Sequence, residues 1–184
     1  MSRIEILSAA SAPADSQSIV QKSVANNGFL PNLIGVLAHA PAALETYMTV
    51  GAINARSSLT LLEREVVQLT AAQIHGCDFC LAGHAAVALK KAGQTPDTVR
   101  ALQAGRTTGD ARIDTVGSFT RAVIKNRGAV PEAEYQAFIA QGYGPQQALE
   151  VILGVSLATL CNFANSLAGT PVNPQLAPYL PGNV

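Results

Sequence analysis

The chain has 184 residues, of which 12 are basic and 12 are acidic, so its formal net charge is zero. This balance excludes a general nucleic-acid or polyanion binder, which would need a basic face. Only 13% of the residues are charged and 48% are apolar, whereas an average soluble domain is about 25% charged. We therefore expect the chain to bury part of its surface in a homo-oligomer, and its length fits a single domain over residues 1–184.

The pattern along the chain is helical throughout. Glycine and proline fall at intervals that separate helices, and no stretch shows the sustained alternation of a strand. The sequence thus predicts an all-α fold, a single-domain helical bundle of about 7–9 helices. The expected helices, in chain order, span 14–27, 31–39, 41–56, 61–75, 77–89, 96–105, 110–126, 131–141 and 145–168.

Two local signals predict where the central helix, 61–75, begins and ends. Thr60 and Glu63 form a capping-box pattern that begins the helix expected over 61–75. Gly76 then breaks the chain before the next helix begins at Cys77. The tail over 171–184 contains four prolines and no helical period, so we expect it to be extended along the surface or on a neighbouring chain.

The most informative feature is a cluster of Cys77, Cys80 and His84, with Glu65 twelve positions before the first cysteine. At 100° per residue, the two cysteines and the histidine fall within about 60° of one another on one helix face. The start of a helix stabilises a thiolate, so the sequence predicts lowered thiol pKa values. The other cysteine, Cys161, lies in an apolar stretch and is interpreted as a small buried apolar residue.

Glu65 is the carboxylate expected to face this cluster. Leu62 and Leu69 flank it three residues before and four residues after, so it borders the apolar stripe of its helix. The turn at Gly76 would fold that helix back against the cysteine helix. A carboxylate partner would fix the tautomer of His84 and raise its basicity.

These residue types predict a thiol-dependent peroxidase, an antioxidant oxidoreductase. His84 would take the proton of a cysteine, and the thiolate would attack a hydroperoxide to form a sulfenic acid. The second cysteine would condense with it into a Cys77–Cys80 disulfide, which an external dithiol must reduce. Helix-end electrostatics favour Cys77 as the attacking thiol, whereas the i, i+4 spacing from His84 favours Cys80.

Other interpretations compete with this one. Cys77, Cys80, His84 and one of Glu65 or His75 could supply four zinc ligands in a metal-binding or oligomeric scaffold protein. The second knuckle typical of structural zinc is missing from the sequence. A lactone-type decarboxylase on the same fold is a third hypothesis. We favour the peroxidase, with no cofactor and no metal.

At these residues the chain resembles the AhpD-like alkylhydroperoxidase group of the carboxymuconolactone decarboxylase family. The family pattern of Glu, eleven residues, Cys, two residues, Cys, three residues and His is met at every spacing. The flanking segment 59–93 is similar to the family core, and Asn162-Phe-Ala-Asn165 followed by Gly169-Thr-Pro171 is similar to peroxidase-related members.

The resemblance implies an all-helical fold that assembles into trimers or hexamers. It also implies that Cys80 attacks the hydroperoxide, that Cys77 resolves the oxidised product, and that Glu65 and His84 relay protons. The reductant would be a dihydrolipoyl group on a partner protein. Phe79 departs from members that carry a histidine just before the second cysteine, and the lactone decarboxylases proper lack the cysteine pair.

The remaining expectations concern location. Residues 1–16 contain three charges and no apolar core typical of a signal peptide, and three cysteines do not form a secreted disulfide framework. The longest apolar stretch, 151–160, is about half the length of a membrane-spanning helix. These features favour a cytoplasmic protein without membrane or nucleic-acid partners.

Overall fold

The computed structural model describes residues 2–184. In that part of the chain the secondary structure consists of nine α-helices and one short 3₁₀ turn, with no strand. The all-α prediction is confirmed. The helices are α1 (Ala14–Asn27), α2 (Asn32–Leu37), α3 (Pro41–Asn54), α4 (Leu61–His75), α5 (Asp78–Lys90), α6 (Pro96–Gln103), α7 (Ala111–Lys125), α8 (Glu132–Ala140) and α9 (Pro145–Ala168), and the turn η1 is Ala177–Tyr179.

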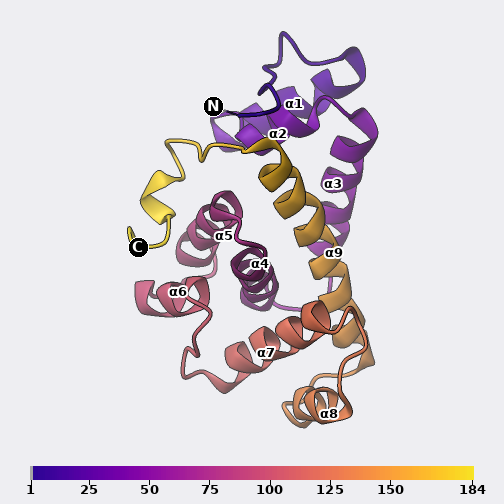
Figure 1. Ribbon diagram of the computed structural model, residues 1–184, viewed down its shortest axis with the longest axis vertical. Helices are drawn as coiled ribbons and strands as arrows, with labels where there is room; N and C mark the ends of the chain where they lie inside the picture. Colours follow the sequence, from indigo (N-terminus) through magenta and orange to yellow (C-terminus); the bar gives the residue numbers. More distant parts are fainter. Residues whose placement is uncertain (1) are drawn as a thin grey trace.

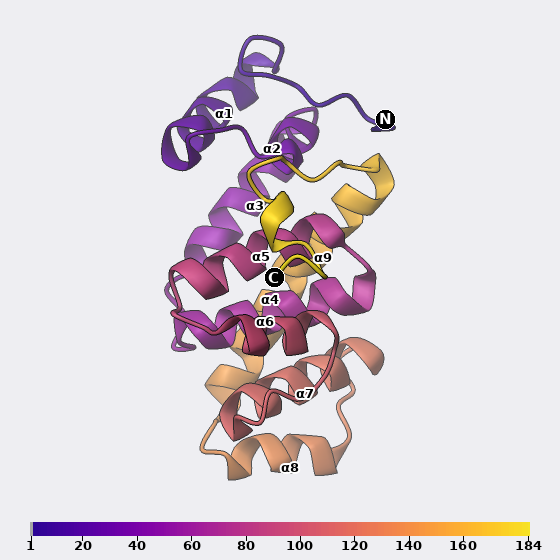
Figure 2. The same cartoon turned by 90° about the vertical axis from the view of Figure 1, so that its left-hand side faces the viewer.

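Helix α4 is the centre of the bundle. It packs against α5, α6, α7 and α9, and Figure 1 shows α4 and α5 side by side between α9 and the C-terminal tail. Turned by 90°, the molecule is elongated, with α1 and α2 at one end and α7 and α8 at the other (Figure 2). The α4–α5 pair therefore lies in the middle of the molecule, where apolar side chains shield it from water.

The sequence explains where α4 begins and ends. The Thr60 amide donates to the Glu63 carboxylate at 2.8 Å, and the Glu63 amide donates to the Thr60 hydroxyl at 3.2 Å, so the predicted capping box is present. At the other end Gly76 adopts φ +67°, the left-handed conformation that glycine tolerates best. The Cys77 amide then donates to the Ala72 carbonyl at 2.9 Å, which closes a Schellman turn.

Helix α9 crosses the back of α4 at close range. A Cβ atom on Gly154 would lie 2.9 Å from Val67 Cγ1, so the two helices approach more closely than a larger residue would permit. Gln68 of α4 donates to the Gly154 carbonyl at 2.9 Å. At 24 residues α9 is long and apolar enough to cross a membrane by length and composition, a test that core helices also pass.

The C-terminal tail lies against α5 and α6 of its own chain. Gln103 donates to the Tyr179 carbonyl at 2.8 Å, and Arg100 donates to the Val184 carbonyl at 2.8 Å. The Lys90 ammonium sits 4.7 Å from the centre of the Tyr179 ring. The tail forms turns over 174–176 and 181–183 on either side of η1, so the expectation of an extended segment is wrong for most of it.

Candidate active site

The turn between α4 and α5 places the two cysteines. Cys77 is the N-cap of α5 in an extended conformation, one residue before the helix that it was expected to begin, and Cys80 lies in the first turn. The Cys80 amide donates to the Cys77 sulfur at 3.4 Å. Both thiols are reduced, and each residue is only 4% exposed. The pair is thus close and shielded from bulk water.

A third side chain holds both sulfurs. The amide nitrogen of Asn165, on α9, donates to Cys80 Sγ at 3.3 Å and to Cys77 Sγ at 3.8 Å. The sequence pattern singled out the Asn162–Asn165 stretch only as a likeness, without a role for Asn165. An amide that donates to both sulfurs stabilises a thiolate on either one.

Glu65 and His84 form the predicted carboxylate–imidazole pair across the α4–α5 hairpin. Glu65 Oε2 and His84 Nδ1 are 2.7 Å apart. Glu65 is buried, whereas 28% of the His84 side chain is exposed. Because Nδ1 is engaged by the carboxylate, Nε2 is the imidazole nitrogen left to exchange protons. Across residues 2–184 no hydrogen bond joins His84 to either sulfur, so a proton would pass through a water or the substrate.

The titration of these groups differs from the sequence-based expectation. The Cys80 thiol and burial raise the pKa of Cys77 well above the usual thiol range. The Cys161 sulfur and burial raise the pKa of Cys80 to about 12, although Cys77 and Asn165 oppose the rise. The predicted lowering of thiol pKa is therefore wrong for the reduced protein, because desolvation and neighbouring thiols outweigh the helix start.

The pKa of His84 is set by two opposing effects, burial and the Glu65 carboxylate. Burial by itself would lower the pKa of His84, but the charge and the hydrogen bond of Glu65 outweigh it, so the pKa is raised. A stronger base holds a proton released from a nearby thiol more readily. The pKa of Cys80 rises less than that of Cys77, which makes Cys80 the easier thiol to ionise.

Cys80 and His84 open onto one cavity of about 430 Å³ between α1, α3 and α5. Most of its other lining is apolar, including Phe29, Leu33 and Phe79. Two lining residues have chemistry that sequence reasoning missed or assigned only to packing: Tyr47 of α3 and Cys161 of α9. Its full lining is Asn26, Asn27, Phe29, Pro31, Leu33, Tyr47, Phe79, Cys80, Gly83, His84, Ala86, Val87, Lys90, Lys91, Cys161 and Leu176.

Cys161 is buried, as expected, but it is also a neighbour of Cys80. Its thiol donates to the Leu157 carbonyl at 3.0 Å, so its sulfur lone pairs remain free to accept from the Cys80 thiol. Such an interaction favours the protonated form of Cys80. Burial is the largest cause that raises the pKa of Tyr47, and the neighbouring Cys161, Cys80 and Glu65 add to the rise, so Tyr47 stays a neutral phenol.

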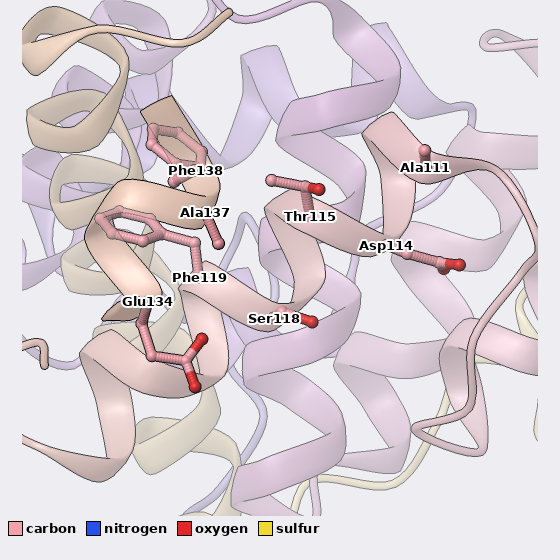
Figure 3. A pocket seen from close by; sticks show the side chains of 8 residues that line it. All are labelled: Ala111, Asp114, Thr115, Ser118, Phe119, Glu134, Ala137 and Phe138. Carbon is pink, nitrogen blue, oxygen red and sulfur yellow. The ribbon is translucent and has the colours of Figure 1, made fainter. Parts of the chain in front are cut away.

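Another depression in the described part of the chain lacks this combination. A depression between α7 and α8 has the stacked rings of Phe119 and Phe138 at one end and the Asp114 carboxylate at the other (Figure 3). The Asp114 carboxylate accepts hydrogen bonds from the Thr108 amide at 2.7 Å and the Thr108 hydroxyl at 2.9 Å, so its role is structural. Within residues 2–184 no group of three or more His, Cys, Asp or Glu side chains is arranged to hold a metal ion.

The site thus combines a buried dithiol with a carboxylate–histidine pair at the start of the second helix of an α-hairpin. Residues 41–113 match the model of the carboxymuconolactone decarboxylase family, and all four motif residues lie in this segment. This match confirms the resemblance to the family that the sequence pattern indicated. No curated protein matches the chain significantly.

Solved structures share the fold over most or all of the chain. An uncharacterized peroxidase-related protein with an AhpD core from Ralstonia eutropha JMP134 is 21% identical, with a TM-score of 0.86 over 100% of this chain and 97% of that one. A second peroxidase-related protein, from Silicibacter sp. TM1040, is 18% identical, with a TM-score of 0.81 over 95% and 93%. The debrominase Bmp8, bound to 2,3,4-tribromopyrrole, is 14% identical, with a TM-score of 0.72 over 89% and 88%.

Proposed function

We propose that this protein is a thiol peroxidase that reduces organic hydroperoxides through Cys77 and Cys80. The observation that carries the proposal is the 2.7 Å contact of Glu65 with His84, on a histidine that shares a cavity with the Cys80 sulfur. An oriented base, a buried nucleophile and a second thiol in reach are the parts that such a cycle needs. The fold of the peroxidase-related structures agrees with this function.

In the oxidative half-reaction, Cys80 loses its proton to His84 as a hydroperoxide enters the cavity. The thiolate attacks the terminal oxygen, the O–O bond breaks, and the leaving alkoxide takes a proton from the imidazolium to become an alcohol. Cys80 is then a sulfenic acid. The Cys77 thiol attacks its sulfur, a disulfide forms, and water leaves. Glu65 holds the imidazole in place throughout.

The lining of the cavity favours an organic hydroperoxide over hydrogen peroxide. Phe29, Leu33, Phe79 and Val87 present apolar surface next to Cys80. Apolar burial is worth roughly 25 cal/mol per Å², so an alkyl or aryl group gains affinity that hydrogen peroxide cannot. Phe79, which departs from members with a histidine here, contributes to this apolar wall rather than to proton transfer.

We also infer that the protein forms a homo-oligomer, a trimer or a hexamer as the resemblance implies, through the outer face of α9. Leu149 and Phe163 are 69% and 56% exposed, and Ile152 lies between them at 40%. Large apolar side chains grouped on one helix face are typical of association surfaces. Light scattering should give a multiple of 19.0 kDa. A Phe163→Glu variant should dissociate, and a monomeric wild type would overturn the inference.

The test of the function is consumption of cumene hydroperoxide in the presence of dithiothreitol, an external dithiol. We expect turnover faster than with hydrogen peroxide, and loss of turnover in Cys80→Ser. Stoichiometric zinc in the purified protein, with no loss of thiols on exposure to hydroperoxide, would support the metal-binding alternative instead. The cytoplasmic location and a lipoylated protein as reductant remain part of the proposal.

A further inference from the structure

The two cysteines open onto different cavities. Cys80 faces the apolar cavity that holds His84, whereas Cys77 lies at the floor of a second cavity of about 320 Å³. This second cavity is bounded by the turn before α5, the end of α9 and the start of the C-terminal tail. Its lining is Gly76, Cys77, Asp78, Phe79, Asn165, Ser166, Gly169, Thr170, Pro171 and Val172. Of Cys77, Cys80 and His84, only Cys77 lines this second cavity.

Two buried oxygens in this second cavity lack partners. Asn165 is 4% exposed, and its Oδ1 has no hydrogen-bond partner within residues 2–184. The Thr170 hydroxyl is buried and unpartnered in the same part of the chain. Buried polar atoms are normally satisfied, because an unmade hydrogen bond costs about 1–3 kcal/mol. Both residues line the opening that ends at Cys77, which points to a ligand with hydrogen-bonding groups.

We propose that this second cavity is the entry site of the reductant, a slender dithiol, separate from the entry of the hydroperoxide. The inference rests on the proposed function and assigns its two half-reactions to two openings. Thiol–disulfide exchange places the attacking thiolate, the attacked sulfur and the leaving sulfur in line. A thiolate that enters past Thr170 meets Cys77 first, with Cys80 on the far side.

The proton balance supports this direction of attack. The reductant thiol first loses its proton to solvent, and solvent returns a proton to His84. The reductant thiolate then forms a bond to Cys77 Sγ, the Cys77–Cys80 bond breaks, and Cys80 leaves as a thiolate that takes a proton from the His84 imidazolium. The second thiol of the reductant then loses its proton to water and attacks the reductant sulfur that is bonded to Cys77 in the mixed disulfide. Cys77 leaves as a thiolate that takes a proton from water, and the reductant departs as a disulfide after two electrons have passed to the protein.

The size and charge of the cavity restrict the reductant. A dithiol completes both exchange steps from one position, whereas a monothiol needs a second molecule at a site that the first still fills. Asp78 is the one acidic residue among the lining residues, which include no lysine or arginine. An anionic tripeptide thiol such as glutathione therefore meets no compensating charge, and a neutral dithiol is preferred.

The test follows reduction of the preformed disulfide. Because diamide can form the disulfide without any hydroperoxide, failure of the proposed peroxidase activity would leave this test intact. Ser166→Trp fills the mouth of the second cavity from an exposed helix position, and Ser118→Trp makes the same change in the unrelated depression of Figure 3. We expect reduction by dihydrolipoamide to slow at least tenfold in Ser166→Trp and to be unchanged in Ser118→Trp.

Two further variants keep the proposal falsifiable. Ala86→Phe narrows the Cys80 cavity and should slow oxidation by cumene hydroperoxide without slowing reduction. Thr170→Val keeps the shape and removes the unpartnered hydroxyl. It should raise the KM for dihydrolipoamide several-fold, whereas a purely structural hydroxyl would leave that KM unchanged. Equal reduction rates in Ser166→Trp and Ser118→Trp, or slower reduction in Ala86→Phe, would overturn the inference.

Discussion

The Glu65 carboxylate of α4 contacts Nδ1 of His84 on α5 at 2.7 Å. This bond joins the two helices of the hairpin at the level of the cysteines. It also leaves the other imidazole nitrogen as the one that can exchange a proton at the Cys80 cavity. The chemistry proposed for the two thiols depends on this relationship, and it has a measurable signature in the pH dependence of stability.

Glu65→Gln should lower the free energy of unfolding in a pH-dependent way. Glu65 raises the pKa of His84 in the folded protein, so the pair stabilises the fold fully below the unfolded histidine pKa of about 6.5. This stabilisation is lost as pH rises through the raised folded pKa. Urea unfolding should show a deficit of about 1–3 kcal/mol near pH 6 that shrinks at higher pH. Exposed Glu45→Gln is the control, and a pH-independent deficit would contradict the prediction.

Asn165→Ala should make both active thiols less acidic. The amide of Asn165 donates to both sulfurs, and it lowers the pKa of each. A hydrogen bond to a charged group is worth about 1.5–3 kcal/mol, so alkylation by iodoacetamide at pH 8 should slow at least about tenfold. Asn162→Ala, one turn earlier, removes a contact with His75 instead and should leave the alkylation rate as it is.

Cys161→Ala should have the opposite effect on Cys80. The neighbouring Cys161 sulfur is the largest cause that raises the pKa of Cys80 to about 12. Its removal should lower that pKa and speed alkylation of Cys80, measured by peptide mass spectrometry across a pH series. Replacing a buried thiol with a methyl group leaves a small cavity, so thermal stability should fall slightly. A pH profile identical to that of the wild type would show that the Cys161 sulfur does not act on Cys80.

Gly154→Ala should destabilise the scaffold behind the site. Its Cβ would lie 2.9 Å from Val67 Cγ1, where α9 crosses α4, and overpacking of this kind costs about 1–3 kcal/mol. Gly83→Ala is the matched control, because a Cβ there meets no atom within 4 Å. Since Gly83 lies inside α5, Gly83→Ala should raise the free energy of unfolding by about 0.4–1 kcal/mol. The measurement is the denaturant midpoint of each variant. Equal midpoints for Gly154→Ala and Gly83→Ala would contradict the close approach of α9 to α4.

Local signals explain why much of the fold was predictable. The capping box at Thr60, the left-handed glycine at Gly76 and the prolines at helix starts act within a few residues, so the sequence placed α4 and α9 at their observed bounds. The pairing of Glu65 with His84 was predictable for the same reason. A tight turn between two helices leaves few ways to fold one on the other.

The remainder of the site depends on distant parts of the chain. Asn165 reaches the cysteines from 85 and 88 residues away, and Tyr47 comes from α3. No local sequence pattern predicts such contacts between residues far apart in the chain. The direction of the thiol pKa shifts was missed for a related reason, because helix-end electrostatics are local, whereas the desolvation that opposes them is set by packing over the whole bundle.

Thiol counting in a single turnover tests the central claim most directly. The reduced protein is mixed with one equivalent of cumene hydroperoxide without any reductant, and the products are mapped by peptide mass spectrometry. The proposal predicts the loss of two thiols together as a Cys77–Cys80 disulfide, a sulfenic acid on Cys80 that dimedone traps in Cys77→Ser, and no reaction in Cys80→Ser. Full retention of thiols in the wild type, or an undiminished rate of oxidation in Cys80→Ser, would contradict it.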